Sequence, residues 1–233
     1  MKLLYSTAPL LLALSLAACN KPEPAAAPAT TTDEATTAGK HDATTQTTGV
    51  GEATAKLDAG AVWTGSLEAC RQANNGADTC LIDTLRSAGA SPSALAAART
   101  LSEQGKPGYV SAWQSTEGVG VATLEFPFRA NTNQGTWLVD STGKTVDVDE
   151  NLLDEPMRNS ADYKAFHDKH PEANPFAPAV AADSDTRPDG GVRLRYTTPM
   201  RTCHACADEG KLTIGYNFDG QRKYLGKELV ELR

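Results

Sequence analysis

A stretch of low complexity, residues 20–60, limits what this chain can fold into. It consists mainly of Ala, Thr, Pro, Asp, Glu and Gly, has no aromatic residue, and carries Val50 and Leu57 as its only large aliphatic side chains. Such a segment cannot bury enough apolar surface to offset the entropy lost on ordering. We therefore expect a disordered tether at 19–60 and a single folded domain at 61–233, which is long enough for one hydrophobic core.

The first eighteen residues have the pattern of a secretory signal peptide. Lys2 provides a basic start, residues 10–14 form an apolar run, and small side chains precede Cys19. The apolar run is too short to cross a membrane, because a membrane-spanning helix needs about 20 apolar residues. The pattern predicts export of the chain into an oxidising compartment.

The residues at the expected cleavage site, Leu16-Ala17-Ala18-Cys19, resemble the lipobox of bacterial lipoproteins. The resemblance implies removal of residues 1–18 and acylation of Cys19, so that lipid chains anchor the mature protein. Several chains anchor stably, because each buried methylene contributes about 0.8 kcal/mol. In Gram-negative lipoproteins, Asn rather than Asp after the cysteine, as at Asn20, implies sorting to the outer membrane, facing the periplasm.

The net charge restricts the partners further. The whole chain has a formal charge of −7, and residues 1–18 contain one charged side chain, Lys2. The mature chain is therefore more acidic still, which argues against nucleic acid and against wide contact with anionic lipid. We expect the lipid to be the membrane link, and an envelope protein or polymer to be the partner.

The hydrophobic pattern of the domain changes from helical to strand-like along the chain. Apolar side chains at helical spacing, capping residues and terminal glycines predict three short helices. These lie at 66–73, 78–88 and 92–104. Alternating apolar residues then predict strands at 109–113, 119–128, 136–140, 145–148, 192–198, 211–218 and 223–232.

One further helix is expected at about 160–169, and a long loop at 171–191. Helices followed by mostly sequential strands favour an α+β domain. We expect an N-terminal cluster of three short helices, one antiparallel sheet of about six strands, and the further helix.

Five cysteines are present, and acylation would use Cys19. The remaining four form an even set, as expected of disulfides in an oxidising compartment. Four cysteines allow three pairings. We predict the local one, Cys70–Cys80 and Cys203–Cys206, because Cys70 and Cys80 lie on consecutive predicted helices joined by a tight loop.

The stretch Cys203-His204-Ala205-Cys206 also allows a redox site, with Cys203 as nucleophile and Cys206 as resolving thiol. In thioredoxin-like proteins, which the motif resembles, a helix follows directly and lowers the thiolate pKa. Here only four residues precede the next predicted strand, and two of them are acidic, which would raise a thiolate pKa. A structural disulfide is therefore the favoured interpretation. Haem attachment is excluded because Ala207 replaces the required histidine.

A metal site is the remaining alternative for this stretch. Cys203 and Cys206 could bind zinc together with His167 and His170, which are spaced to share a helix face. A reduced metal thiolate is less expected in an oxidising compartment. We predict no resident cofactor.

Two weaker features complete the candidate sites. Arg193 and Arg195 share one face of a predicted strand and could hold an anionic group, although a solvated face is the commoner outcome. The acidic stretch 147–151 begins like a calcium loop, but Leu152 and Arg158 stand where that loop requires Gly and Glu. We expect a solvated acidic turn there.

Together these features favour a non-catalytic envelope lipoprotein with a disulfide-stabilised binding domain. One subtype is an inhibitor or immunity protein, because an acidic domain suits a basic, lysozyme-like enzyme through electrostatic steering. A periplasmic thiol-disulfide oxidoreductase and a metal-binding lipoprotein are the alternatives. The domain, with its helical cysteine pair and its C-terminal CHAC hairpin, also resembles uncharacterised Gram-negative lipoproteins, a resemblance that implies no activity.

Overall fold

The computed structural model describes residues 57–72 and 76–233. The predicted signal peptide, the lipobox and residues 20–56 lie outside this part of the chain. Within it, no helix has the length and apolar character needed to cross a membrane. Leu57, which we had assigned to the tether, is instead buried in the hydrophobic core. The folded domain therefore includes residues 57–60, and the predicted boundary at 61 is too late.

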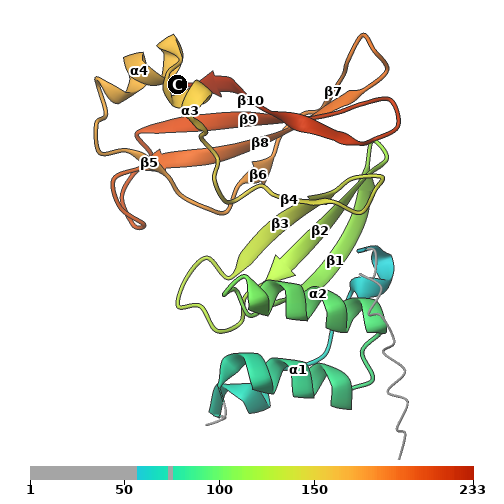
Figure 1. Ribbon diagram of the computed structural model, residues 1–233. Helices are drawn as coiled ribbons and strands as arrows, with labels where there is room; N and C mark the ends of the chain where they lie inside the picture. Colours follow the sequence, from blue (N-terminus) through green and yellow to red (C-terminus); the bar gives the residue numbers. More distant parts are fainter. Residues whose placement is uncertain (1–56, 73–75) are drawn as a thin grey trace, which may run out of the picture. The chain divides into compact units, whose positions relative to one another are not determined.

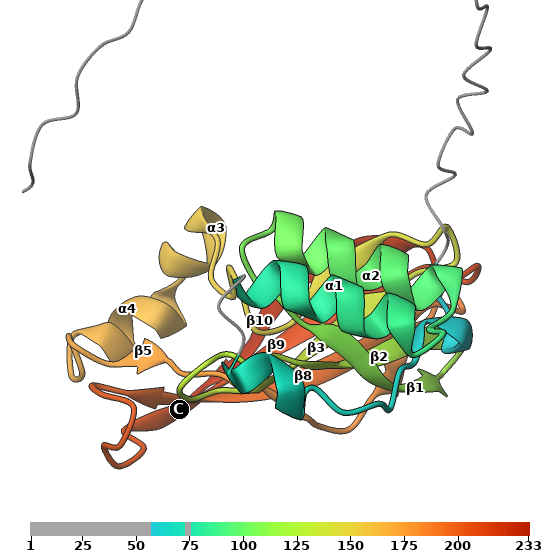
Figure 2. The ribbon, with the colours of Figure 1, turned by 90° about the horizontal axis from the view of Figure 1, so that it is seen from below.

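The described chain opens with short helices. They are η1 Ala59–Ala61, η2 Glu68–Gln72, α1 Ala77–Ser87 and α2 Pro92–Glu103. Ser91 begins α2, because its hydroxyl accepts a hydrogen bond from the Ala94 amide at 3.0 Å. Leu81 and Leu85 of α1 are fully buried against Ala98 of α2. This apolar contact explains why the two helices run side by side (Figure 2).

The first sheet has four antiparallel strands in sequence order. They are β1 Tyr109–Thr116, β2 Val119–Glu125, β3 Gln134–Val139 and β4 Thr145–Asp147. Its two faces contribute to different cores. Ala122 and Trp137 pack with Leu101 of α2, which covers one face (Figure 1). Val121 and Leu138 point the other way and join the core of the second sheet.

The second sheet is built on three long antiparallel strands. They are β8 Val192–Arg201, β9 Gly210–Phe218 and β10 Tyr224–Leu232. Three two-residue strands pair with the outer edge of β8: β5 Asn174–Pro175, β6 Val180–Ala181 and β7 Asp185–Thr186. The segment predicted as a long loop is therefore partly strand. Short helices precede it, α3 Glu155–Arg158 and α4 Ala161–His167.

The described chain contains both helices and antiparallel sheets, as an α+β domain requires. The expected single sheet of about six strands is wrong: the strands form two sheets, of four and six strands. Two-residue periodicity shows which side chains share a face, but it does not show which strands are neighbours. The break falls between β4 and β5, where the chain leaves the first sheet.

Asp140, directly after β3, links the two sheets. Asp140 is buried, with only 3% of its surface exposed. Its Oδ1 accepts hydrogen bonds from the Thr142 and Lys144 amides at 2.8 and 3.0 Å, and its Oδ2 accepts one from the Tyr224 amide of β10 at 3.1 Å. Burial raises the pKa of this carboxyl, but the hydrogen bonds from Thr142, Tyr224 and Lys144 outweigh burial, so its pKa lies below the usual value.

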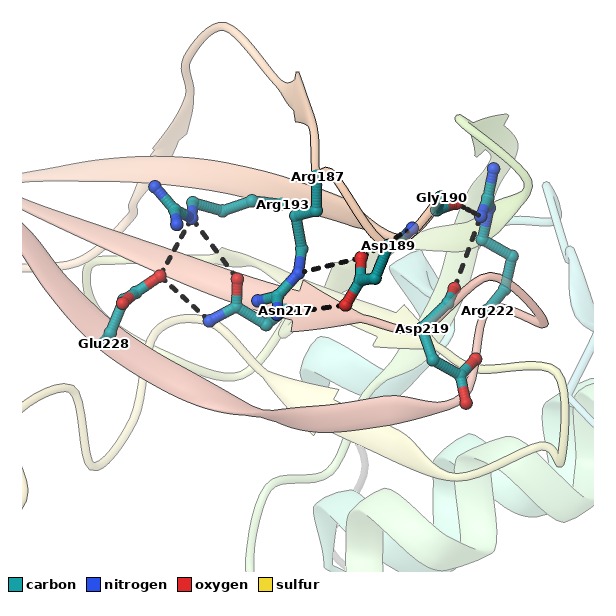
Figure 3. A network of polar contacts seen from close by, with 9 residues as sticks. Arg187, Asp189, Gly190, Arg193, Asn217, Asp219, Arg222 and Glu228 are labelled. Atoms are coloured by element: carbon teal, nitrogen blue, oxygen red, sulfur yellow. Dashed lines mark hydrogen bonds and ion pairs between the residues drawn. The ribbon is translucent and has the colours of Figure 1, made fainter.

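Arg222 joins the neighbouring turns to the same region. Its guanidinium donates a hydrogen bond to the carbonyl of Glu117, which lies between β1 and β2. It also donates to the carbonyl of Gly190 at 3.2 Å and to that of Asp219 at 3.3 Å (Figure 3). Its own carbonyl accepts a hydrogen bond from the Ser141 amide at 3.0 Å. Turns from both sheets therefore meet at one arginine.

The structure joins Cys70 to Cys80, the local pairing that we predicted, and the bond closes a loop of ten residues. Replacing both by Ala should lower the free energy of unfolding by about 2–3 kcal/mol, because the unfolded chain gains loop entropy. Thermal and urea unfolding measure the effect. The matched control is the double replacement of Cys203 and Cys206. Their disulfide closes a loop of only three residues, so its loss should lower the free energy of unfolding by less. An unchanged melting temperature for the Cys70/Cys80 variant would contradict a stabilising role.

Candidate functional site

A groove of about 610 Å³ lies at the end of the second sheet where β8 and β9 are connected. Residues 176–178 and 180–181 line it from the segment that runs along the edge of β8. Thr197, Pro199 and Arg201 line it from β8 itself, where they alternate with buried residues. Asp208, Lys211 and Arg233 complete the lining. The volume falls within the range of ligand-binding clefts, about 300–1,000 Å³.

The charged side chains of the groove are mostly cations. Arg201 is paired with Asp208, the only carboxylate side chain of the lining, at 2.6 Å between Nε and Oδ1. Arg233 Nη1 lies 3.4 Å from Glu231, and both side chains are largely exposed. Lys211 forms no ion pair with any residue in the described part of the chain. The groove therefore carries net positive charge on a chain whose overall charge is −7.

Most of the rest of the lining is apolar, and part of it is exposed. Val180 is 64% exposed. Among the described residues, Val180 and Leu225 are the two large hydrophobic residues that are exposed. Phe176, Ala177 and Pro178 lie beside it in the groove lining. The Phe176 amide donates to the Pro199 carbonyl at 2.9 Å, which holds the segment against β8. Apolar surface beside a few charged groups is typical of a binding site.

Asp149 holds the segment around Ala179, which lines the groove, in place. Its Oδ1 accepts a hydrogen bond from the Ala179 amide at 2.6 Å, and its Oδ2 accepts one from the Thr136 amide of β3 at 2.9 Å. Burial is the main cause that raises the pKa of this carboxyl above its usual value, and the nearby Asp147 adds to the rise, while the two amide hydrogen bonds oppose it. The expected solvated acidic turn is therefore wrong at Asp149. Asp147 is likewise paired, with Lys106 at 3.0 Å.

The CHAC stretch forms part of the β8–β9 connection beside the groove. Cys203 and Cys206 are joined in a disulfide, the second of the predicted pairs. Cys203 is exposed and Cys206 is partly buried. Residues 207–209 lead into β9 without forming a helix, so the helix that lowers a thiolate pKa in thioredoxin-like proteins is missing at this point.

The predicted zinc ligands are not gathered into a site. His170 Nδ1 lies 3.0 Å from Glu209 Oε2, and His167 stacks on Tyr163 with ring centroids 5.6 Å apart. Cys203 and Cys206 are bonded to each other. Across residues 57–72 and 76–233, no group of three or more His, Cys, Asp or Glu side chains is placed to hold a metal ion.

Arg193 and Arg195 share the outer face of β8, as their spacing predicts, but carboxylates already neutralise both. Arg193 Nε lies 2.8 Å from Glu228 Oε1 and donates to Asn217 Oδ1 at 3.3 Å (Figure 3). Arg195 pairs with Asp185. The two arginines therefore hold strands of the sheet together, and their positive charges are already compensated.

Sequence reasoning missed the groove, because its lining comes from positions between 176 and 233 that only the fold brings together. One signal was present. Residues 175–182, read as part of a loop, contain only Pro, Phe, Ala and Val. A surface loop is usually polar, so an uncharged apolar run indicates packing or binding.

Comparison of the chain with protein-family models, with curated proteins and with solved structures yields no match.

Asp149 makes a contribution to the free energy of unfolding that depends on pH, and the sign of this dependence follows from its raised pKa. The folded protein holds this proton more tightly than the unfolded chain, so the stabilisation is complete below the unfolded pKa of about 3.9 and is lost as the pH rises through the folded value. We expect the free energy of unfolding of the wild type, relative to Asp149→Asn, to increase as the pH falls from 7 to about 4. Urea titrations at a series of pH values measure this difference. Parallel pH profiles for the two proteins would exclude a raised pKa at Asp149.

Proposed function

We propose that this chain is a non-catalytic, lipid-anchored envelope protein whose folded domain binds a partner through the groove at the β8–β9 end. The observation that carries the proposal is the mixed lining of the groove, with exposed Val180 beside Lys211. Apolar surface supplies contact energy, and a few charged groups fix the orientation of a ligand. The lining contains no histidine, cysteine or serine, and its Asp208 is already paired with Arg201.

The disulfides suit this function, because disulfides form and persist in an oxidising compartment such as the bacterial periplasm. One pair lies between short N-terminal helices and the other beside the groove. A closed β8–β9 connection limits the conformations of a binding surface, which reduces the ordering cost of association.

The membrane anchor belongs to the proposal and rests on the lipobox. With the anchor in the outer membrane, the folded domain would face the periplasm. Replacing residues 1–19 by a secretory signal peptide that is cleaved without a lipobox should move the protein from the membrane fraction to the soluble fraction, because the acyl chains are the proposed membrane link. Cell fractionation with an immunoblot measures this. A protein that lacks residues 1–19 but stays membrane-bound would contradict lipid anchoring through Cys19.

The class of partner follows from the positive charge of the side chains that line the groove. The inhibitor or immunity subtype requires a basic enzyme, which would be repelled by the cations of the groove and attracted to the acidic remainder of the domain. A groove with Lys211, Arg233 and exposed apolar side chains favours a partner with negative charge at the point of contact. We therefore propose an acidic or anionic envelope component as the partner.

Site-specific photocrosslinking in intact envelopes tests the groove. A photoreactive side chain at position 180 should form adducts, because Val180 lies in the lining. The matched control is position 225, where Leu225 is similarly exposed, 55% against 64%, but lies outside the groove. Adducts at 180 should decrease when Lys211 is replaced by Glu. Equal adducts at both positions, or adducts insensitive to the Lys211→Glu change, would contradict binding at the groove.

A further inference from the structure

We infer that the groove takes up an extended polypeptide segment in which carboxylates stand among apolar side chains. The inference rests on the proposed function, because it names the ligand of the same groove. Three features of the described residues support it, and each concerns a different part of the ligand: its charge, its side chains and its backbone.

The charge of the ligand follows from two adjacent cations. Lys211 and Arg233 exchange two backbone hydrogen bonds, of 2.7 and 3.2 Å. Residues directly opposite in an antiparallel pair place their side chains on the same face, and like charges there repel each other. Glu231 offsets only Arg233, at 3.4 Å, and the Lys211 ammonium forms no ion pair with any described residue. A carboxylate bound between the two cations would relieve this repulsion with charge-assisted hydrogen bonds.

The apolar part of the ligand follows from the opposite side of the groove. Val180, Phe176 and Pro178 line the groove from one short segment of chain. Val180 is 64% exposed, so apolar side chains of a ligand could remove much of its surface from water. A ligand with both apolar side chains and a carboxylate would use both sides of the groove, and it is therefore favoured over a simple anion. Salt would weaken the charged contacts of such a ligand but not its apolar contacts.

The backbone of the ligand follows from the edge position of β6. In the described sheet, β6 pairs only with β8. The Ala182 amide donates to the Arg195 carbonyl of β8 at 2.8 Å, so by alternation the neighbouring Ala181 turns its own N–H and C=O away from β8. These outward groups can pair with the main chain at the apolar end of a ligand, and the extended chain can continue from there across the end of β8 toward Lys211, whereas a lipid or a glycan offers no matching repeat of donors and acceptors. No charged side chain between 175 and 182 protects this edge.

Selection from a displayed library of random twelve-residue peptides tests the inference with a defined probe. The full-length protein is the target, and the Lys211→Glu protein is used to remove peptides that do not need the cation. The matched control is Lys223→Glu, since Lys223 is also exposed but lies beyond the far end of β9. Thermal unfolding of each variant verifies that it folds like the wild type.

Enriched peptides should contain Asp or Glu beside apolar residues. Their dissociation constants should rise about tenfold or more with Lys211→Glu, or when the peptide carboxylates are changed to amides, because a charged hydrogen bond is lost. Lys223→Glu should leave the constants within about twofold. Failure to enrich any peptide, enrichment of basic peptides, or full binding to the Lys211→Glu protein would overturn the inference.

The crosslinking experiment separates this inference from the proposed function. Adducts at position 180 that depend on Lys211 but carry a non-peptide mass on the crosslinked fragment, as measured by mass spectrometry, would assign the groove to a non-protein polymer, which overturns the peptide inference and leaves the binding function standing. A peptide mass on that fragment supports the peptide. No adducts at all, together with no enriched peptides, would overturn both.

Discussion

The hydrogen bonds to Asp140 are the contact on which the arrangement of the two sheets depends. The Asp140 carboxylate accepts hydrogen bonds from amides of its own turn and from the amide of the first residue of β10. Arg222 donates hydrogen bonds to carbonyls of the surrounding turns. Hydrogen bonds to a charged group contribute about 1.5–3 kcal/mol each. This junction lies where β8 begins and β9 ends, whereas the groove lies where β8 ends and β9 begins. A nine-residue strand is roughly 30 Å long, so the sheet is fixed at one end and available for binding at the other.

Much of the secondary structure could be predicted, because it depends on local patterns. Ser91 before Pro92 marked the start of α2, and the alternation of Val192, Leu194 and Tyr196 marked β8. The Cys70–Cys80 bond followed from two adjacent short helices. Leu57 was missed, because one apolar residue in a polar segment gives no periodic signal.

The division into two sheets and the groove were beyond prediction for a related reason. Both depend on contacts between residues distant in sequence. Asp149 shows this most clearly, since an acidic residue in an acidic turn is normally solvated. Here two amides from separate segments, at Ala179 and Thr136, surround it. Arg193 and Arg195 show the converse case, because their spacing indicated an anion site that Glu228 and Asp185 already neutralise.

Amide hydrogen exchange of the full-length protein, with and without a solubilised envelope fraction, tests most directly whether the groove is the binding surface. We expect added protection at 176–182, at the end of β8 and at the start of β9, because the lining comes from these segments. Little change is expected in α1, α2 and β1. Protection concentrated in those elements, or no protection anywhere, would contradict binding at the groove.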